Sequence, residues 1–162
     1  VSPVVWDDLV LAVTGPGPGA VCLRLKDNLD EGQTYEEVWR DRRALDSQFN
    51  GLAVSDGCVF GYTSSRQGGS KFRCVDFATG EVNWEWESDL GRGSLVAVDG
   101  RFILWGERGD LAVLELRTDE PRVLWRSQQP LLSAPCYSSP ALAGGRLYLR
   151  NESELVCVNL RH

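Results

Sequence analysis

An internal repeat constrains this sequence more than any other feature. Four segments share one pattern: a few small or apolar residues, a tight turn rich in Asp or Gly, and a second apolar run. The segments are 2–13, 50–62, 94–105 and 139–149, so successive starts lie 48, 44 and 45 residues apart. Self-similarity at a nearly fixed period indicates a repeat architecture, and it therefore takes precedence over local propensity.

Two further elements follow each segment. One is an apolar run whose positions match between repeats, at 20–25, 72–77, 111–116 and 155–160. The other ends in a tryptophan, at Trp39, Trp84 and Trp125, and the fourth repeat does not include it. Short β-branched and aromatic runs between Gly, Asp and Asn turns are typical of strands. Four strands in a period of roughly 40–50 residues are typical of a β-propeller blade.

The predicted fold is all-β, a β-propeller of four-stranded antiparallel blades. We expect one domain over residues 1–162, with blades at about 2–49, 50–93, 94–138 and 139–162, the last incomplete. Propellers close with roughly 4–8 blades, so about four blades are half of an eight-bladed ring.

A partial ring exposes the apolar faces of its end blades, which seldom stay uncovered. The abrupt start at a blade boundary favours further blades in the same protein, whose N-terminal part would supply the missing outer strand. The alternatives are a separate protein partner and a head-to-tail homodimer.

One stretch favours a helix when it is considered alone. Thr34-Tyr-Glu-Glu37 is a capping box, and good helix formers follow it. The aligned Trp39 nevertheless predicts a strand here, because tertiary pairing overrides weak propensity. We expect a linker after this strand, with room for a helical turn.

The second repeat carries the sharpest motif. Its run Cys74-Val-Asp-Phe-Ala-Thr-Gly-Glu-Val-Asn-Trp84 resembles the Ala-x-Asp-x-x-Thr-Gly-x-x-x-Trp signature of the PQQ-like (quinoprotein-type) β-propeller repeat family, with Cys in place of Ala. The other three repeats match the signature loosely. The resemblance implies that the aligned tryptophans dock one blade on the next. The motif residues of this chain are Trp39, Asp76, Thr79, Gly80, Trp84 and Trp125.

The physical roles of this motif follow from its residue types. Thr79-Gly80 suits a tight turn between two strands, and the Asp76 carboxylate can accept hydrogen bonds from that turn's backbone. A tryptophan combines a large flat apolar body with one N–H donor, so it can wedge between blades and bond a carbonyl.

The resemblance implies several functional classes. Many members bind no quinone, and we favour a non-catalytic protein-interaction scaffold similar to the BamB-like outer-membrane assembly group. Such a protein acts in the periplasm or cell envelope and needs no cofactor, and it binds at its loop rims or central funnel. The alternatives are a propeller fragment of a PQQ-dependent quinoprotein dehydrogenase, which requires PQQ with calcium, and a ligand-sensing propeller. Those dehydrogenases often carry an adjacent Cys-Cys pair, which this chain lacks.

Composition narrows the chemistry further. The net charge of −6 argues against a nucleic-acid partner, because phosphate neutralisation needs a basic surface. No apolar run approaches the roughly 20 residues of a membrane-spanning helix. The single histidine, His162, leaves Ser and Cys without the usual general base, so we do not expect an enzyme.

The five cysteines and one loop complete the candidates. Cys22, Cys74 and Cys157 share one repeat position and are expected to be small buried apolar residues. Cys58 and Cys136 fit no such position, and a disulfide between them remains an alternative. The loop beside Tyr62 and Arg66 is a candidate contact surface.

Overall fold

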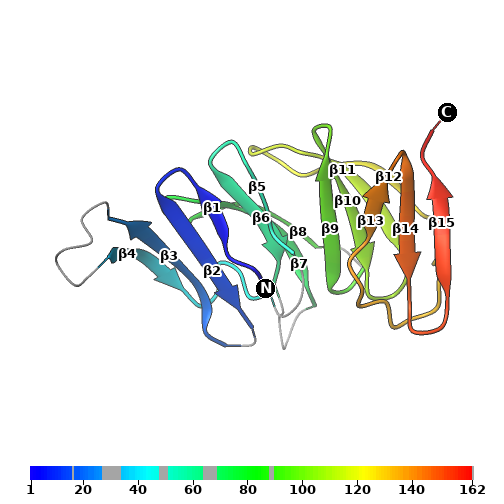
Figure 1. The fold of residues 1–162 in the computed structure, drawn as a ribbon, viewed down its shortest axis with the longest axis horizontal. Coiled ribbons are helices and arrows are strands. Elements are labelled where there is room, and N and C mark those ends of the chain that lie inside the picture. Colours follow the sequence, from blue (N-terminus) through cyan, green and yellow to red (C-terminus); the bar gives the residue numbers. More distant parts are fainter. Residues whose placement is uncertain (16, 27–33, 48–50, 64–68, 88–89, 162) are drawn as a thin grey trace.

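The computed structural model describes residues 1–15, 17–26, 34–47, 51–63, 69–87 and 90–161. Strands and turns make up this part of the chain, so the all-β prediction is confirmed. The strands form four separate antiparallel sheets in chain order (Figure 1). We call them the first to the fourth sheet.

Each sheet is a meander of consecutive strands. The first contains β1 (Val4–Trp6), β2 (Leu9–Thr14), β3 (Gly19–Leu25) and β4 (Tyr35–Asp41). The second contains β5 (Ala53–Ser55), β6 (Cys58–Tyr62), β7 (Lys71–Asp76) and β8 (Val82–Glu87). The third contains β9 (Gly93–Val98), β10 (Arg101–Gly106), β11 (Leu111–Glu115) and β12 (Arg122–Arg126). The fourth has three strands, β13 (Ala141–Ala143), β14 (Arg146–Arg150) and β15 (Leu155–Asn159).

The first hairpin of each sheet turns on a short Asp/Gly pair. Asp56 and Asp99 have φ values of 50° and 48°, and the glycine that follows each one is also left-handed. Two consecutive positive φ values match the right-handed twist of the flanking strands, which explains the Asp-Gly sequence at these turns.

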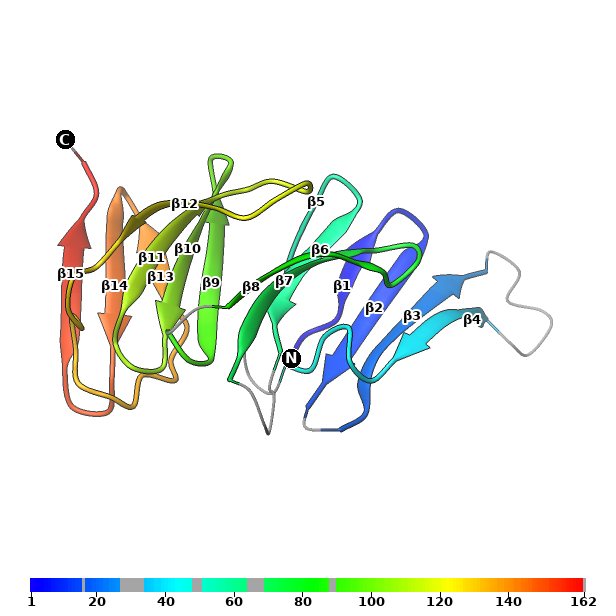
Figure 2. The same ribbon diagram turned by 180° about the vertical axis from the view of Figure 1, so that it is seen from behind.

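The sheets stand side by side, and both views show them following one another in chain order (Figures 1 and 2). The first strands of neighbouring sheets contact each other, β1 with β5 and β5 with β9. The outer strands are therefore β4, β8 and β12. Three buried clusters lie at the junctions between successive sheets, and this inter-sheet packing forms the core.

The outer strand pairs with the same irregularity in three sheets. A β-bulge interrupts the register after Cys22, after Cys74 and after Val113. The residue opposite each of these positions is a tryptophan, Trp39, Trp84 or Trp125. The repeat is thus reproduced to the level of single cross-strand pairs, including the bulge that directs each tryptophan.

Residues 34–47 are not helical. Tyr35–Asp41 is the strand β4, because it pairs with β3 over its whole length. Residues 42–44 form bends, and Asp46 makes an isolated bridge with Thr63, so the linker holds no helical turn in its described part. Across the described residues, no helix long and apolar enough to cross a membrane is found.

Candidate functional site

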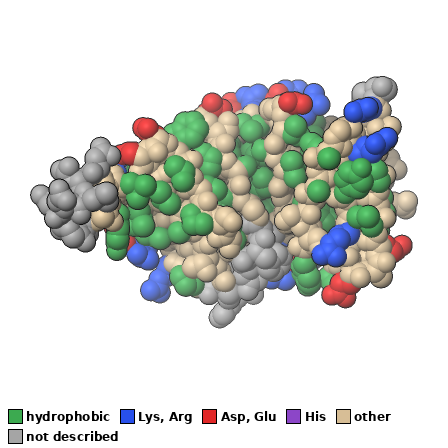
Figure 3. All heavy atoms as spheres, in the orientation of Figure 1, with side chains coloured by type: hydrophobic (Ala, Val, Ile, Leu, Met, Phe, Trp, Pro, Cys, Tyr) green, Lys and Arg blue, Asp and Glu red, His purple; other side chains and the backbone are tan. Residues whose placement is uncertain are grey.

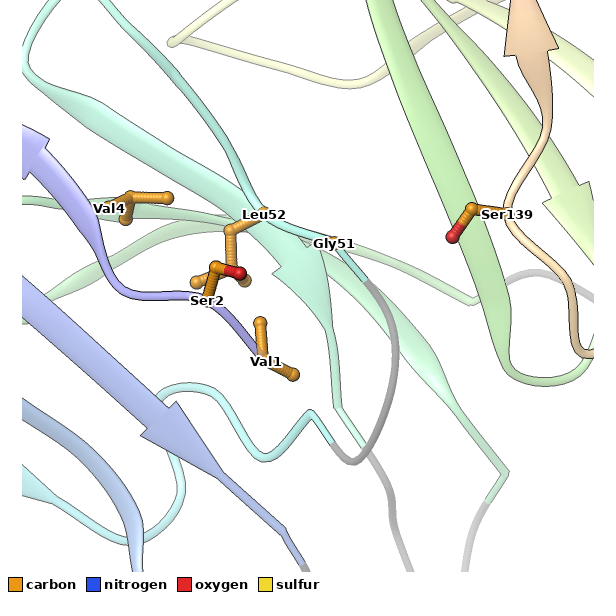
Figure 4. Close-up of a pocket in the computed structure, with 6 residues that line it drawn as sticks. All are labelled: Val1, Ser2, Val4, Gly51, Leu52 and Ser139. Carbon is orange, nitrogen blue, oxygen red and sulfur yellow. The ribbon is translucent and has the colours of Figure 1, made fainter.

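A cavity of about 540 Å³ opens where the first strands of three sheets begin. Its lining comes from segments far apart in the sequence, as Figure 4 shows. Ser2 and Leu52 lie close together on one side, and Ser139 lies across the opening. The lining residues are Val1, Ser2, Val4, Gly51, Leu52 and Ser139.

Three lining residues occupy one repeat position. Ser2, Gly51 and Ser139 each stand five residues before the first residue of their sheet's hairpin turn, and Ser94 stands at that position in the third sheet. Ser94 is buried, and its hydroxyl accepts a hydrogen bond from the Ser139 hydroxyl at 3.4 Å. Small residues here allow neighbouring first strands to approach closely.

We call this space the inner cavity. The side chains that line it supply hydroxyl groups and apolar surface, and none of them is charged. Such a lining can exchange hydrogen bonds with a backbone or a neutral polar group and pack an apolar side chain beside it. No sequence motif marks these serines as a site. The alignment of the repeats could have indicated them, because the repeats begin at or beside Ser2, Asn50, Ser94 and Ser139.

Two of the aligned tryptophans reach the next sheet. The Trp39 indole Nε1 donates to the carbonyl of Phe77 at 3.0 Å, and the Trp84 Nε1 donates to the carbonyl of Arg117 at 3.1 Å. Trp84 is only 8% exposed. The Trp39 ring lies so close to Gly80 that a Cβ on that glycine would stand 2.7 Å from it.

The turn that receives Trp39 is held by one carboxylate. The Asp76 Oδ1 accepts hydrogen bonds from the backbone N–H groups of Ala78 and Thr79 at 3.0 and 2.8 Å, and from the Thr79 hydroxyl at 3.0 Å. Gly80 follows with a φ of +78°, which favours glycine. The four motif residues Trp39, Asp76, Thr79 and Gly80 therefore meet at one place.

We expected Trp125 to dock on the next sheet, but the structure places its side chain elsewhere. It is 50% exposed on the outer strand β12. Two features of the chain explain the difference. Two more residues separate Trp125 from Glu115 than separate Trp84 from Asp76. In addition, the turn that receives Trp39 joins the third and fourth strands of the next sheet, and the described part of the fourth sheet has three strands.

The candidate contact loop is also corrected. Tyr62 is 1% exposed within β6, and its ring packs on Phe72 with centroids 5.1 Å apart. It is part of the core because the alternate residues of β6 face the third sheet. Arg66 lies outside the described residues.

The repeat cysteines do not share one environment. Cys22 and Cys74 are fully buried, whereas Cys157 is exposed. The expectation of burial at Cys157 is wrong, because Cys22 and Cys74 pair with a tryptophan on a fourth strand and β15 pairs only with β14 among the described residues. Burial raises the pKa of the Cys22 thiol to about 11 and also raises that of Cys74.

Cys58 and Cys136 are both buried free thiols, so the disulfide between them is not present. Cys58 instead lies near Cys74, and the Asn83 side-chain amide donates to both sulfurs at 3.3 and 3.8 Å. Burial raises the pKa of Cys58 and Cys136. Thiols held in the protonated form are weak nucleophiles.

The four meander sheets, arranged with their first strands in contact, define blades of a β-propeller. No family model matches the sequence, and no curated protein matches it. Comparison with solved structures supports the fold. BamB from Moraxella catarrhalis is similar with a TM-score of 0.58 and 16% identity, covering 96% of this chain and 41% of that chain.

Two further structures extend the similarity. A europium-containing methanol dehydrogenase has a TM-score of 0.55 at 17% identity, over 77% of this chain and 24% of that chain. The WD40 domain of Toxoplasma gondii coronin has a TM-score of 0.55 at 13% identity, over 93% of this chain and 41% of that chain. This chain therefore has a β-propeller fold and spans less than half the length of each of these proteins.

The alternative implied by the sequence resemblance, a quinone with calcium, requires ligands for a cation. Within the described residues, no group of three or more His, Cys, Asp or Glu side chains could hold a metal ion. The side chains that line the inner cavity include no carboxylate.

Proposed function

We propose that this chain is a non-catalytic, PQQ-like propeller scaffold for protein interaction, similar in role to BamB-like proteins. The observation that carries the proposal is the edge of β15, which pairs only with β14 among the described residues. The partner is a protein segment that adds a strand there, either from further blades of the same protein or from a separate chain. Action in the periplasm or cell envelope remains a prediction from the resemblance.

The edge strand β15 has the features of a strand acceptor. Leu155 is 68% exposed, and Leu160 just beyond the strand is 41% exposed. Figure 3 shows hydrophobic and basic side chains together at this end of the molecule. A free strand edge offers a row of backbone donors and acceptors, and an added extended segment satisfies them.

The first and second sheets indicate which type of residue the added strand places opposite Cys157. Cys157 stands at the repeat position of Cys22 and Cys74, and each of those is covered by a tryptophan on the fourth strand. An incoming strand that places an aromatic side chain opposite Cys157 reproduces this pairing. The inner cavity lined by Ser2 and Ser139 then lies on the opposite side of the sheets, where it offers a second contact.

A tethered copy of the native fourth strand tests the proposal. We would append a copy of residues 78–87, which include β8, after Leu160 of the chain. The tether raises the local concentration of the strand far above that of a free peptide. We expect slower amide hydrogen exchange in β15 and loss of Cys157 alkylation by iodoacetamide.

The matched control carries Pro for Asn83 and Ala for Trp84 within the appended copy, because proline removes a ladder donor. We expect this control to leave β15 and Cys157 as they are in the unextended chain. Equal protection by both appended strands, or protection by neither, contradicts the strand-acceptor proposal. Saturable binding of PQQ with calcium by the unextended chain contradicts the non-catalytic scaffold.

A further inference from the structure

A second cavity of about 540 Å³ lies between the third and fourth sheets. Apolar side chains dominate its lining, with one arginine and one aspartate at the hairpin end. The lining residues are Val98, Asp99, Arg101, Ile103, Leu111, Val113, Leu142, Gly144, Gly145, Leu147 and Leu160. This volume is within the range of small-molecule sites, roughly 300–1,000 Å³.

The equivalent residues at the junction between the first and second sheets show which side chain can lie in such a space. Val113 occupies the position of Cys22, opposite the outer-strand tryptophan. Leu147 and Leu160 occupy the positions of Val59 and Phe77, and the backbone N–H groups of Leu160 and Phe77 both donate to a hairpin glycine carbonyl. Between the first and second sheets, the Trp39 indole packs in the cluster that contains Val59 and Phe77.

The equivalent indole does not pack in the core between the third and fourth sheets. Trp125 is half exposed, and the buried cluster of this junction is formed by aliphatic residues, Trp105 and Cys136. The cavity between these sheets is therefore lined in part from the repeat positions that surround the Trp39 indole at the first junction. The volume is sufficient for an aromatic ring, and the apolar side chains of the lining suit one.

The rim of the cavity adds a charge preference. Arg101 occupies the position that Leu9 and Cys58 hold in the first two sheets, and no ion pair to it is found among the described residues. The Arg161 side chain lies across the Gly145 hairpin, with its Nε 2.7 Å from where a Cβ on that glycine would stand. The cross-strand partner of Arg101 is Glu115, whose carboxylate pairs with Arg117 and Arg122. The Arg101 guanidinium at the cavity rim can therefore take an anionic group of a ligand.

We propose that this cavity binds a small aromatic carboxylate, with its ring between the sheets and its carboxylate on Arg101. The ring replaces the indole that the first junction receives from its own chain. The site lies between two sheets, away from the inner cavity, and goes beyond the scaffold role. It shares Leu160 with the segment just after β15, so the test uses the chain without an added strand.

Isothermal titration calorimetry of the 162-residue chain with indole-3-propionate tests the proposal. We expect saturable binding with one site per chain, and none with propionate, which lacks the ring. The Arg101→Gln variant should weaken binding about three- to tenfold, as expected for loss of a partly exposed charged contact. The Arg122→Gln variant is the matched control, because this arginine lies on β12 and pairs with Glu115, and it should bind as the unmodified chain does.

A cavity-filling variant provides the second arm. Ile103→Phe introduces the side chain that Phe60 supplies at the equivalent position, and it should abolish binding while circular dichroism stays unchanged. If this variant misfolds, the comparison of Arg101→Gln with Arg122→Gln still decides the proposal. Binding that is absent in the unmodified chain but present in Trp125→Ala overturns it, because Trp125 itself then fills the cavity. Equal binding by the Arg101→Gln and unmodified chains also overturns it.

Discussion

The junction between the second and third sheets and the junction between the third and fourth are built from equivalent repeat positions, yet they pack differently. The former holds an aromatic cluster in which the Phe60 and Phe102 ring centroids are 4.7 Å apart and those of Phe72 and Trp84 are 5.9 Å apart. The latter holds mainly aliphatic side chains, a cavity of about 540 Å³ and a half-exposed Trp125.

This difference shows that the tryptophan position alone does not produce docking. Trp84 and Trp125 both sit on the outer strand opposite a bulge. Trp84 reaches a carbonyl at the end of the next sheet's third strand, where that sheet continues into a fourth. We infer that the indole docks where the receiving sheet has a fourth strand and where the spacing from the third strand is that of Trp84.

The tryptophans themselves should give the largest contrast. Trp84→Ala should lower the free energy of unfolding by about 3–5 kcal/mol, because it removes a buried indole and leaves a cavity. Trp125→Ala should lower it by less than about 1 kcal/mol, since half of that side chain is already in water. Urea denaturation followed by circular dichroism measures both, and equal losses would contradict the assigned packing.

The receiving turn should give the next largest contrast. Gly80→Ala combines a positive φ with a Cβ placed against the Trp39 ring, and should cost about 2–4 kcal/mol. Gly100→Ala is the matched control, because its φ is +69° and nothing lies within 4 Å of the added Cβ. Thermal denaturation should show a cost of about 1 kcal/mol for the control. A similar cost at both glycines would show that contact with the Trp39 ring does not contribute to the cost at Gly80.

The carboxylate that holds this turn should have a smaller effect. Asp76→Ala should cost about 1–2 kcal/mol, because three donors lose one acceptor at a partly solvated turn. Glu115 stands at the equivalent position in the third sheet and contacts arginines instead. Glu115→Ala should cost about 0.5 kcal/mol in the same urea assay. Equal costs for Glu115→Ala and Asp76→Ala would show that the hydrogen bonds to Asp76 stabilise the protein no more than the surface contacts of Glu115 do.

The smallest effect concerns a surface carboxylate. The hydrogen bond from Arg117 lowers the pKa of Asp119 from 3.8 to about 2. A depressed pKa in the folded state means that the stabilising contribution is present above pH 3.8 and is lost as the pH falls towards 2. An NMR titration of the Asp119 carboxyl should have its midpoint near 2. Arg117→Gln should raise that midpoint, and an unchanged midpoint would contradict the assigned pairing.

The sequence was sufficient to predict the all-β fold and the meander order, because the repeat constrained every strand at once. It also corrected a local signal: the capping box at Thr34–Glu37 favours a helix, yet Tyr35–Asp41 pairs with β3. Long-range pairing that recurs at one period overrode a propensity that is worth little for each residue.

The functional residues were harder to predict, because their environment depends on neighbouring sheets. Trp125 and Cys157 stand at the same repeat positions as Trp84 and Cys74, yet both are exposed. The described part of the fourth sheet has three strands, and Trp125 also stands two residues further along the chain. Tyr62 stands beside a loop, which suggests a surface, but every residue of β6 is buried and Tyr62 packs in the core cluster between the second and third sheets. The serines of the inner cavity lie far apart in the sequence, so only the spatial arrangement of the sheets brings Ser2 and Ser139 to one opening.

In the described part of the chain, no strand pairs with the outer edge of β15, and one repeat position reports on this edge. Cys22, Cys74 and Cys157 are equivalent cysteines in three sheets, so a thiol reagent compares them within one molecule. We would treat the native chain with iodoacetamide and locate the labels by peptide mass spectrometry. The account predicts rapid labelling of Cys157 with Cys22 and Cys74 protected until the chain is unfolded. Protection of Cys157 equal to that of Cys74 in the native chain would contradict it.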